Sequence, residues 1–336
     1  MKKRVGNGWR NKRMLPGHQQ VAILTLLVGV ICVWVECSRL VTPYGNLLHE
    51  DSFILLGNSP KGVHPHYGAV KVVDKIEDVT LEVSKNHPFV LRNLVNRWQG
   101  FNDSVFNLDG FAGEFGDITT MTQENNYPTV QLSDRGKERS LQELNKIVRC
   151  PAATREPPSI YGAASLSLEQ RNKLWGNLYL PPTLQDDVFI ECLGRKLADE
   201  FLSSFFWTQI FVGVEGTGME MHKDTIRTHV WTAQLEGEKQ AVFCPPGSKK
   251  IEAFGETLST DGSNSCLWAA LQPGELLFWP SNWLHQTLNS IGPSVALSGM
   301  AVPDGELAKE FLNTIKGHPR MSKALRKKVY QCTSKT

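Results

Sequence analysis

The sequence predicts a mainly β protein with flanking helices: a jelly-roll or cupin-like double-stranded β-helix behind an N-terminal membrane anchor. Short strand-like runs separated by turn signals fill the later half of the chain, among them residues 274–280 and 294–302. An uncharged apolar run, residues 21–35, follows a basic leader. With 336 residues and 41% hydrophobic content, the chain can bury one sizeable core.

Composition divides the chain into five segments. We expect a basic cytoplasmic leader at 1–20, a signal anchor or transmembrane helix at 21–40, a stem at 41–70, one catalytic domain at 71–302 and a basic helical tail at 303–336. The stem is assigned because residues 41–70 are rich in Pro, Gly and Asn and have no sustained periodicity.

Charge is concentrated at the start of the chain. The first twenty residues hold six basic side chains and no acid, and the remaining 30 basic residues are outnumbered by the 34 acids. The leader should therefore stay in the cytosol by the positive-inside rule. Because the rest of the chain is mildly acidic, bulk charge gives no support for a nucleic-acid partner.

The apolar run sets the expected location. Fifteen residues are short for a membrane span, which needs about 20, but neighbouring residues up to Leu40 can extend the run. We expect a single-pass type II membrane protein of the endoplasmic reticulum or Golgi, with the catalytic domain in the lumen. The alternative is a cleaved signal peptide and a soluble luminal protein, since signal peptides have apolar regions of about 7–15 residues.

Cysteines and one glycosylation motif are compatible with that location. Six cysteines lie beyond the apolar run and allow up to three disulfides, whose pairing the sequence leaves open. Asn102-Asp103-Ser104 is an acceptor triplet for glycosylation.

Local patterns predict the elements in order. Residues 71–84 should form a strand and a turn, 87–98 a buried strand, and 106–122 a short helix followed by a strand. Residues 140–148 have helical spacing, and Pro-rich turns follow them. A helix at 197–206 should lead into a strand at 207–214, and residues 229–246 should form two strands around a turn at Glu236-Gly237. From Gly305 onward the chain has a helical, basic pattern.

The stretch that organises the chemistry is residues 217–246. His222 and Asp224 are two residues apart, so an extended backbone would place both side chains on one face. A second histidine, His285, follows in a later strand-like block. Two histidines and one carboxylate form a facial triad, which leaves three metal positions open and is typical of non-haem Fe(II) oxygenases.

Three blocks resemble the JmjC (jumonji-type) family of Fe(II)/2-oxoglutarate oxygenases. Residues 87–98 resemble the family's amino-terminal strand, residues 222–246 its His-x-Asp block with a Gly-x-Lys motif, and residues 273–289 its Pro-x-x-Trp-x-His block. The blocks occur in the family's order across residues 70–302. The spacing within the second block looks most like the protein-hydroxylase branch.

The resemblance implies a role for individual residues. His222, Asp224 and His285 would be the catalytic iron ligands, and Lys239 would pair with the distal carboxylate of 2-oxoglutarate. Asn289 and Ser298 match polar positions of the cosubstrate pocket. Thr232 stands where many relatives have Asn, and its hydroxyl can still bond to a carboxylate. Tyr161 is a candidate for the family's cosubstrate tyrosine.

The implied function is hydroxylation of a protein side chain with Fe(II), 2-oxoglutarate and O2. A protein substrate and, through the anchor, a membrane are the expected partners, and the sequence does not set the oligomeric state. The alternatives are an N-methyl demethylase, a small-molecule oxygenase or cupin isomerase, and a non-catalytic JmjC binding module. Intact ligand positions disfavour the non-catalytic module, and Lys239 favours 2-oxoglutarate over isomerase chemistry.

Overall fold

Strands dominate the part of the chain that the computed structural model describes, as the sequence predicts. The described residues are 67–101, 105–124, 137–149, 160–248, 266–303 and 305–333. The leader, the anchor, nearly all of the stem and the Asn102 acceptor lie outside these ranges. A search of the described residues finds no helix with the length and apolarity to cross a membrane.

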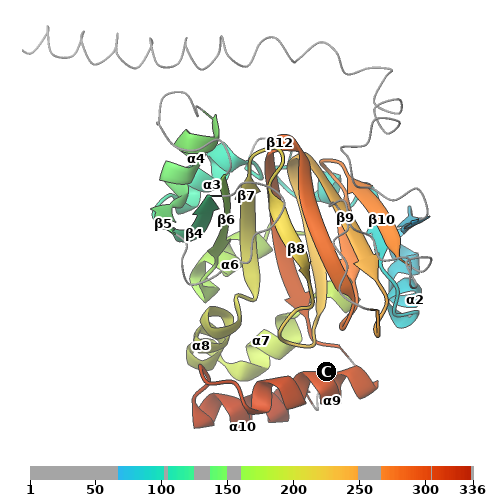
Figure 1. Cartoon of the computed structure of the whole chain (residues 1–336). Coiled ribbons are helices and arrows are strands. Elements are labelled where there is room, and N and C mark those ends of the chain that lie inside the picture. Colours follow the sequence, from blue (N-terminus) through green and yellow to red (C-terminus); the bar gives the residue numbers. More distant parts are fainter. Residues whose placement is uncertain are drawn as a thin grey trace, which may run out of the picture. The chain divides into compact units, whose positions relative to one another are not determined.

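Two long strands build the barrel at the centre of the fold (Figure 1). They are β9 (His229–Cys244) and β12 (Leu284–Ala301), which pair antiparallel along most of their length. Four shorter strands join them: β7 (Thr208–Gly213), β8 (Gly218–His222), β10 (Leu267–Leu271) and β11 (Leu276–Trp279).

Each long strand takes part in two four-stranded layers. The first half of β9 and the second half of β12 lie between β11 and β7, which gives the order β11-β9-β12-β7. The second half of β9 and the first half of β12 lie between β10 and β8, which gives the order β10-β9-β12-β8. Two layers that share their central strands form the predicted jelly-roll arrangement.

The expected hairpin at Glu236-Gly237 is wrong. Both halves of β9 pair with the same neighbour, β12, so the chain continues as one strand and does not fold back on itself. Gly237 has a φ of +65°, and a Cβ there would lie 2.4 Å from the carbonyl oxygen of Ile291. The glycine therefore permits a bend between the two layers at the point where the pairing register with β12 shifts.

Further strands widen the first layer on both sides. Beyond β11 come β3 (Phe89–Leu91) and β2 (Lys71–Val73), and beyond β7 come β6 (Ile160–Ser165), β4 (Thr119–Glu124) and β5 (Lys137–Ser140). A two-residue strand, β1 (Gly68–Ala69), pairs with β10. The sheet thus joins the amino-terminal blocks of the sequence to the barrel.

The described helices lie around this sheet (Figure 1). They are α2 (Val79–Ser84), α3 (Leu108–Phe115), α4 (Leu141–Arg149), α6 (Leu168–Trp175), α7 (Asp187–Leu193), α8 (Arg195–Phe205), α9 (Gly305–Lys316) and α10 (Lys323–Thr333). The predicted helices near residues 106–115, 140–148 and 197–206 are confirmed as α3, α4 and α8. Residues 79–84 form α2, where a turn was expected, and β6, α6 and α7 were not predicted.

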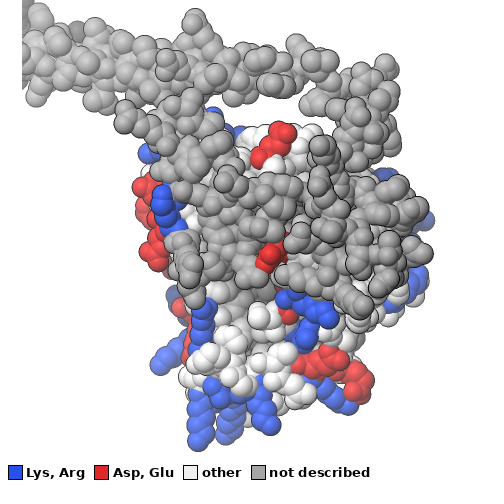
Figure 2. Space-filling model, viewed as in Figure 1, with Lys and Arg blue, Asp and Glu red and all other residues white. Residues whose placement is uncertain are grey.

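The C-terminal helices pack against α7 and α8. Phe311 and Ile315 of α9 and Leu325 and Val329 of α10 are fully buried in the apolar cluster that contains Phe201 of α8. The basic side chains of this region face outward, and Figure 2 shows Lys and Arg gathered along the lower edge of the view, where α10 lies in Figure 1. The exposed members are Lys309, Lys316, Arg320, Lys323 and Lys327, whereas Arg326 and Lys328 are half-buried.

Candidate active site

Strand alternation in β9 separates the core from the site. Trp231, Ala233 and Leu235 are buried in the larger apolar cluster with residues of the surrounding helices. Val230 and Thr232 lie on the opposite face and line a cavity inside the barrel. Polar residues at interior positions of a barrel strand are therefore the ones available to a ligand.

The predicted metal ligands meet at one end of this cavity. His222, the last residue of β8, and His285 of β12 are direct partners in the ladder between these strands, and their ring centroids are 4.2 Å apart. Asp224 lies two residues beyond the end of β8, and its Oδ1 is 3.9 Å from Nε2 of His222 and 3.8 Å from Nε2 of His285. One ligand atom from each residue lies within 4.8 Å of the others, so together they can hold a metal ion.

Backbone carbonyls orient both histidines for this task. Nδ1 of His222 lies 2.7 Å from the carbonyl oxygen of Glu220, and Nδ1 of His285 lies 3.2 Å from that of Trp283. A ring that donates its Nδ1–H to a carbonyl keeps Nε2 as the free acceptor. Both Nε2 atoms then face Asp224, which is the arrangement a metal requires.

Burial favours the neutral form of His285, which is the form that can bind a metal. Desolvation in the barrel, and then the nearby His222, lower the pKa of His285 to about 4. The imidazole is therefore neutral at physiological pH, the form that binds metals. The donor set of two imidazoles and one carboxylate on one side fits the facial triad and Fe(II).

A buried cation lies in the same cavity. Lys239 of β9 is only 4% exposed, and burial lowers its pKa to about 7. Its Nζ donates to Oδ1 of Asn289 at 2.7 Å, and no carboxylate in the described part of the chain pairs with it. A buried ammonium without a counter-charge is costly, so this position favours an anionic ligand.

The other predicted cosubstrate residues fall into two groups. Thr232 and Ser298 are cross-strand partners that line the cavity, and their hydroxyls are 3.0 Å apart. Asn289 is not among the lining residues. It lies behind Lys239, accepting from Nζ and donating to Oγ1 of Thr217 at 3.2 Å, so it holds the lysine in place.

Tyr161 of β6, the candidate for the cosubstrate tyrosine, lines the cavity. Its ring centroid is 5.7 Å from Nζ of Lys239, and burial raises its pKa above the usual range, so the phenol keeps its proton. The phenol is hydrogen-bonded to Thr287, a lining residue that the sequence reasoning missed. Alternation could have found Thr287, because it follows His285 by two positions on the same strand.

The cavity that these residues share inside the barrel has a volume of about 110 Å³.

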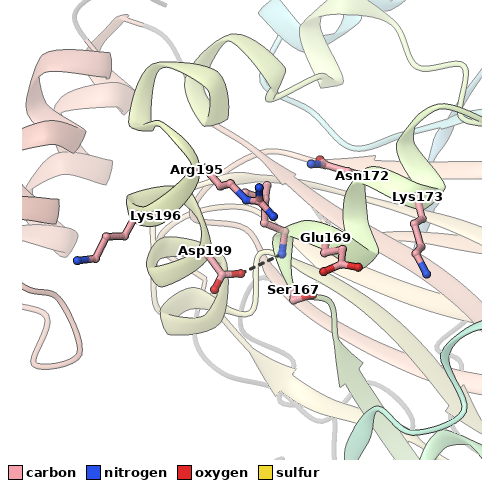
Figure 3. Close-up of a pocket in the computed structure, with 8 residues that line it drawn as sticks. Ser167, Glu169, Asn172, Lys173, Arg195, Lys196 and Asp199 are labelled. Carbon is pink, nitrogen blue, oxygen red and sulfur yellow. Dashed lines mark hydrogen bonds between the residues drawn. The ribbon is translucent and has the colours of Figure 1, made fainter.

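A second, much wider groove of about 1120 Å³ lies between α6 and α8 (Figure 3). There, exposed Arg195 and Lys173 stand beside Glu169 and Asp199, whose Oδ1 accepts from the backbone N–H of Leu168 at 3.2 Å. The histidine-carboxylate cluster found among the described residues lies in the barrel and not in this groove.

The jelly-roll barrel, the His-Asp-His cluster and the buried lysine together match the arrangement that the resemblance to the JmjC family implies. Comparison with curated proteins confirms the resemblance stated from the sequence. The chain is 24% identical over 237 residues to the arginine-specific demethylase JMJ20 of Arabidopsis thaliana, which covers 62% of this chain and 50% of that protein.

Two further relatives have similar identities. The lysine-specific demethylase JMJ21 of Arabidopsis thaliana is 22% identical over 246 residues, covering 66% of this chain and 24% of that protein. The 2-oxoglutarate and iron-dependent oxygenase JMJD4 of Mus musculus is 29% identical over 97 residues, covering 24% of this chain and 23% of that protein. No model of a known protein family matches the chain. The matched region spans half or less of each relative's length.

Proposed function

We propose that this chain is an Fe(II)- and 2-oxoglutarate-dependent dioxygenase that hydroxylates a protein side chain in the secretory pathway. The observation that carries the proposal is Lys239, a buried cation without a carboxylate partner in the described part of the chain, in the same cavity as the triad. A site with three metal ligands and a separate cation fits a cosubstrate that chelates the metal at one end and carries a second carboxylate at the other.

Each site residue has a defined task in this proposal. His222, Asp224 and His285 hold Fe(II), Lys239 pairs with the distal carboxylate, and Thr232, Ser298 and Tyr161 offer it hydroxyl groups. Fe(II) with 2-oxoglutarate supplies the oxidation, in which O2 gives one oxygen atom to the substrate and one to succinate while CO2 is released. The protein binds, orients and excludes water, which is the usual division of labour with a cofactor.

Demethylation is the main competing activity. Two of the relatives are named demethylases, and one is named an oxygenase without a substrate class. Hydroxylation of an N-methyl carbon uses the same site and ends in loss of formaldehyde. We favour protein hydroxylation because the spacing from His222 to Lys239 resembles the hydroxylase branch and because a luminal enzyme is separated from chromatin.

Disulfides support the luminal location. Cys244 bonds to Cys266 at the ends of β9 and β10, and Cys192 of α7 bonds to Cys332 of α10. Such bonds persist in oxidising compartments and are rare in the cytosol.

Protease protection tests this location. The full chain is made in the presence of microsomes with a tag at its C-terminus, and the tag should resist added protease until detergent opens the membrane. Digestion of the tag without detergent would contradict the proposed location.

One experiment separates the proposed activities. The purified full chain is incubated with Fe(II), ascorbate, 2-oxoglutarate and ¹⁸O2 in an extract of secretory-pathway proteins, followed by peptide mass spectrometry. We expect succinate release and peptides that gain one ¹⁸O atom, with neither product formed by His222→Ala. Loss of methyl groups with formaldehyde release would instead establish a demethylase, and absence of succinate in every extract would contradict the proposal.

A further inference from the structure

Trp279 lies inside the site but is neither one of the three proposed metal ligands nor one of the proposed cosubstrate residues. It is the last residue of β11, where its backbone pairs with Val230 of β9, and it is only 6% exposed. Its side chain lines the cavity that holds the triad.

The indole contacts two of the three proposed metal ligands. Its Nε1–H donates to Oδ2 of Asp224 at 3.3 Å, and its ring centroid is 4.9 Å from that of His285. Phe243, 5.7 Å away, packs against the same indole and restricts its orientation. Trp279 is therefore held by packing while its single donor points at a ligand carboxylate.

Asp224 needs such support more than the histidines do. The histidines belong to paired strands and are oriented by backbone carbonyls, whereas Asp224 follows the end of β8 with its side chain 25% exposed. Among the described residues, Trp279 is the one whose hydrogen bond to this carboxylate is observed; the Nε2 atoms of His222 and His285 lie 3.9 and 3.8 Å from Oδ1, beyond hydrogen-bond distance. With Oδ2 engaged, Oδ1 is the oxygen directed toward both Nε2 atoms.

We propose that Trp279 is a positioning residue that holds Asp224 as a one-oxygen ligand. A carboxylate that bound the metal through both oxygens would occupy one of the three positions left open by the triad. The hydrogen bond from Trp279 keeps that position available for the chelating cosubstrate. This inference rests on the proposed function for its purpose, but the effect on metal binding can be measured without turnover.

The test compares two buried tryptophans, each of which donates one hydrogen bond from its indole nitrogen. Trp279→Phe keeps an aromatic ring and removes the donor to Asp224. Trp98→Phe is the matched control, because Trp98 is only 3% exposed and its Nε1–H donates at 3.0 Å to the backbone carbonyl of Tyr179, outside the cavity that holds the triad. Mn(II) affinity of the metal-free full chain is measured by calorimetry, and 2-oxoglutarate affinity is measured on the Mn(II)-saturated chain.

We expect Trp279→Phe to weaken Mn(II) binding by about 10-fold or more, the scale typical for residues that orient a ligand. Its 2-oxoglutarate affinity should also fall, while Trp98→Phe keeps both wild-type values. Thermal unfolding of the metal-free variants shows whether each remains folded. Wild-type Mn(II) affinity in Trp279→Phe, or an equal loss in both variants, would overturn the inference.

The result for Trp279 can be distinguished from the result for the proposed activity. A wild-type chain that binds Mn(II) but never forms succinate contradicts the proposed activity, and the comparison of the two variants still decides the role of Trp279. A wild-type chain that binds no Mn(II) contradicts the triad and this inference together.

Discussion

In the proposed function, Lys239 is the residue on which recognition of the cosubstrate depends. Burial lowers its pKa from 10.5 to about 7, so the empty site holds a charged lysine only below that pH. An anion that pairs with Nζ restores the charged form, and binding above pH 7 must therefore take up a proton. By the same linkage, the empty chain should gain stability as the pH rises above 7, because the unfolded lysine still binds its proton there.

This gives a prediction at the residue scale. Above pH 7, the affinity of the Mn(II)-loaded chain for 2-oxoglutarate should fall with rising pH, and calorimetry in buffers of different ionisation enthalpy should detect proton uptake. Lys239→Met should lose about 2–5 kcal/mol of 2-oxoglutarate binding and the proton uptake, with little change in Mn(II) affinity. A variant that binds 2-oxoglutarate as the wild type does would show that another group holds the anion.

Residue spacing was sufficient to predict some of these side chains and not others. The interval of two between His222 and Asp224 and the matching block around His285 indicated the metal ligands, which the structure brings together. The sequence indicated that Trp279 belongs to the core or the pocket wall, but not that it contacts Asp224. Its proposed function depends on that contact with a distant part of the sequence, which spacing does not report.

Strands β8 and β12 are the elements that bring the two histidines together. His222 and His285 are partners in this ladder, which continues through Met219 and Gly218 opposite Thr287 and Leu288. Gly218 permits the close approach, because a Cβ there would lie 2.0 Å from the carbonyl oxygen of Thr287. The two strands cannot keep this separation with any larger residue at position 218.

Gly218→Ala should therefore disturb both stability and the metal site. We expect a loss of about 1–3 kcal/mol in the free energy of unfolding, the usual cost of overpacking, and weaker Mn(II) binding. Gly113→Ala in α3 is the control, since a Cβ there meets nothing within 4 Å and alanine is the better helix former. Equal melting temperature and Mn(II) affinity in Gly218→Ala and the wild type would refute the proposed role of this strand pairing.

At the scale of elements, prediction from the sequence was correct where the whole pattern lay within a single helix or strand. The helices near 106–115 and 197–206 were found from local spacing. The bend at Gly237 was misread as a hairpin, because a Gly after Glu in a polar interval has the same local signature in both cases. Only the shared neighbour β12 distinguishes them, and that pairing is a long-range feature.

At the scale of the molecule, the C-terminal tail is joined to the rest of the fold. Helices α9 and α10 share an apolar cluster with α7 and α8, and the Cys192–Cys332 bond links residues 140 positions apart. The sequence counted the cysteines but left their pairing open, since pairing depends on which elements meet in space.

This bond should contribute to stability and not to the site. The double variant Cys192→Ser/Cys332→Ser should lose about 2–5 kcal/mol in the free energy of unfolding, because the bond closes a long loop in the unfolded chain. Mn(II) affinity should be unchanged, since the bond lies among the helices and apart from the cavity. Chemical denaturation of the oxidised wild type and the variant measures the difference, and identical unfolding curves would argue that the cysteines are not bonded.

The central claim is that the triad and Lys239 form one site for a metal and 2-oxoglutarate. Calorimetric titration of 2-oxoglutarate into the full chain, with and without saturating Mn(II), tests it most directly. We expect tight binding that requires Mn(II) and is lost in both Asp224→Ala and Lys239→Met. Binding of 2-oxoglutarate that is equally strong without Mn(II), or that survives in both variants, would contradict it.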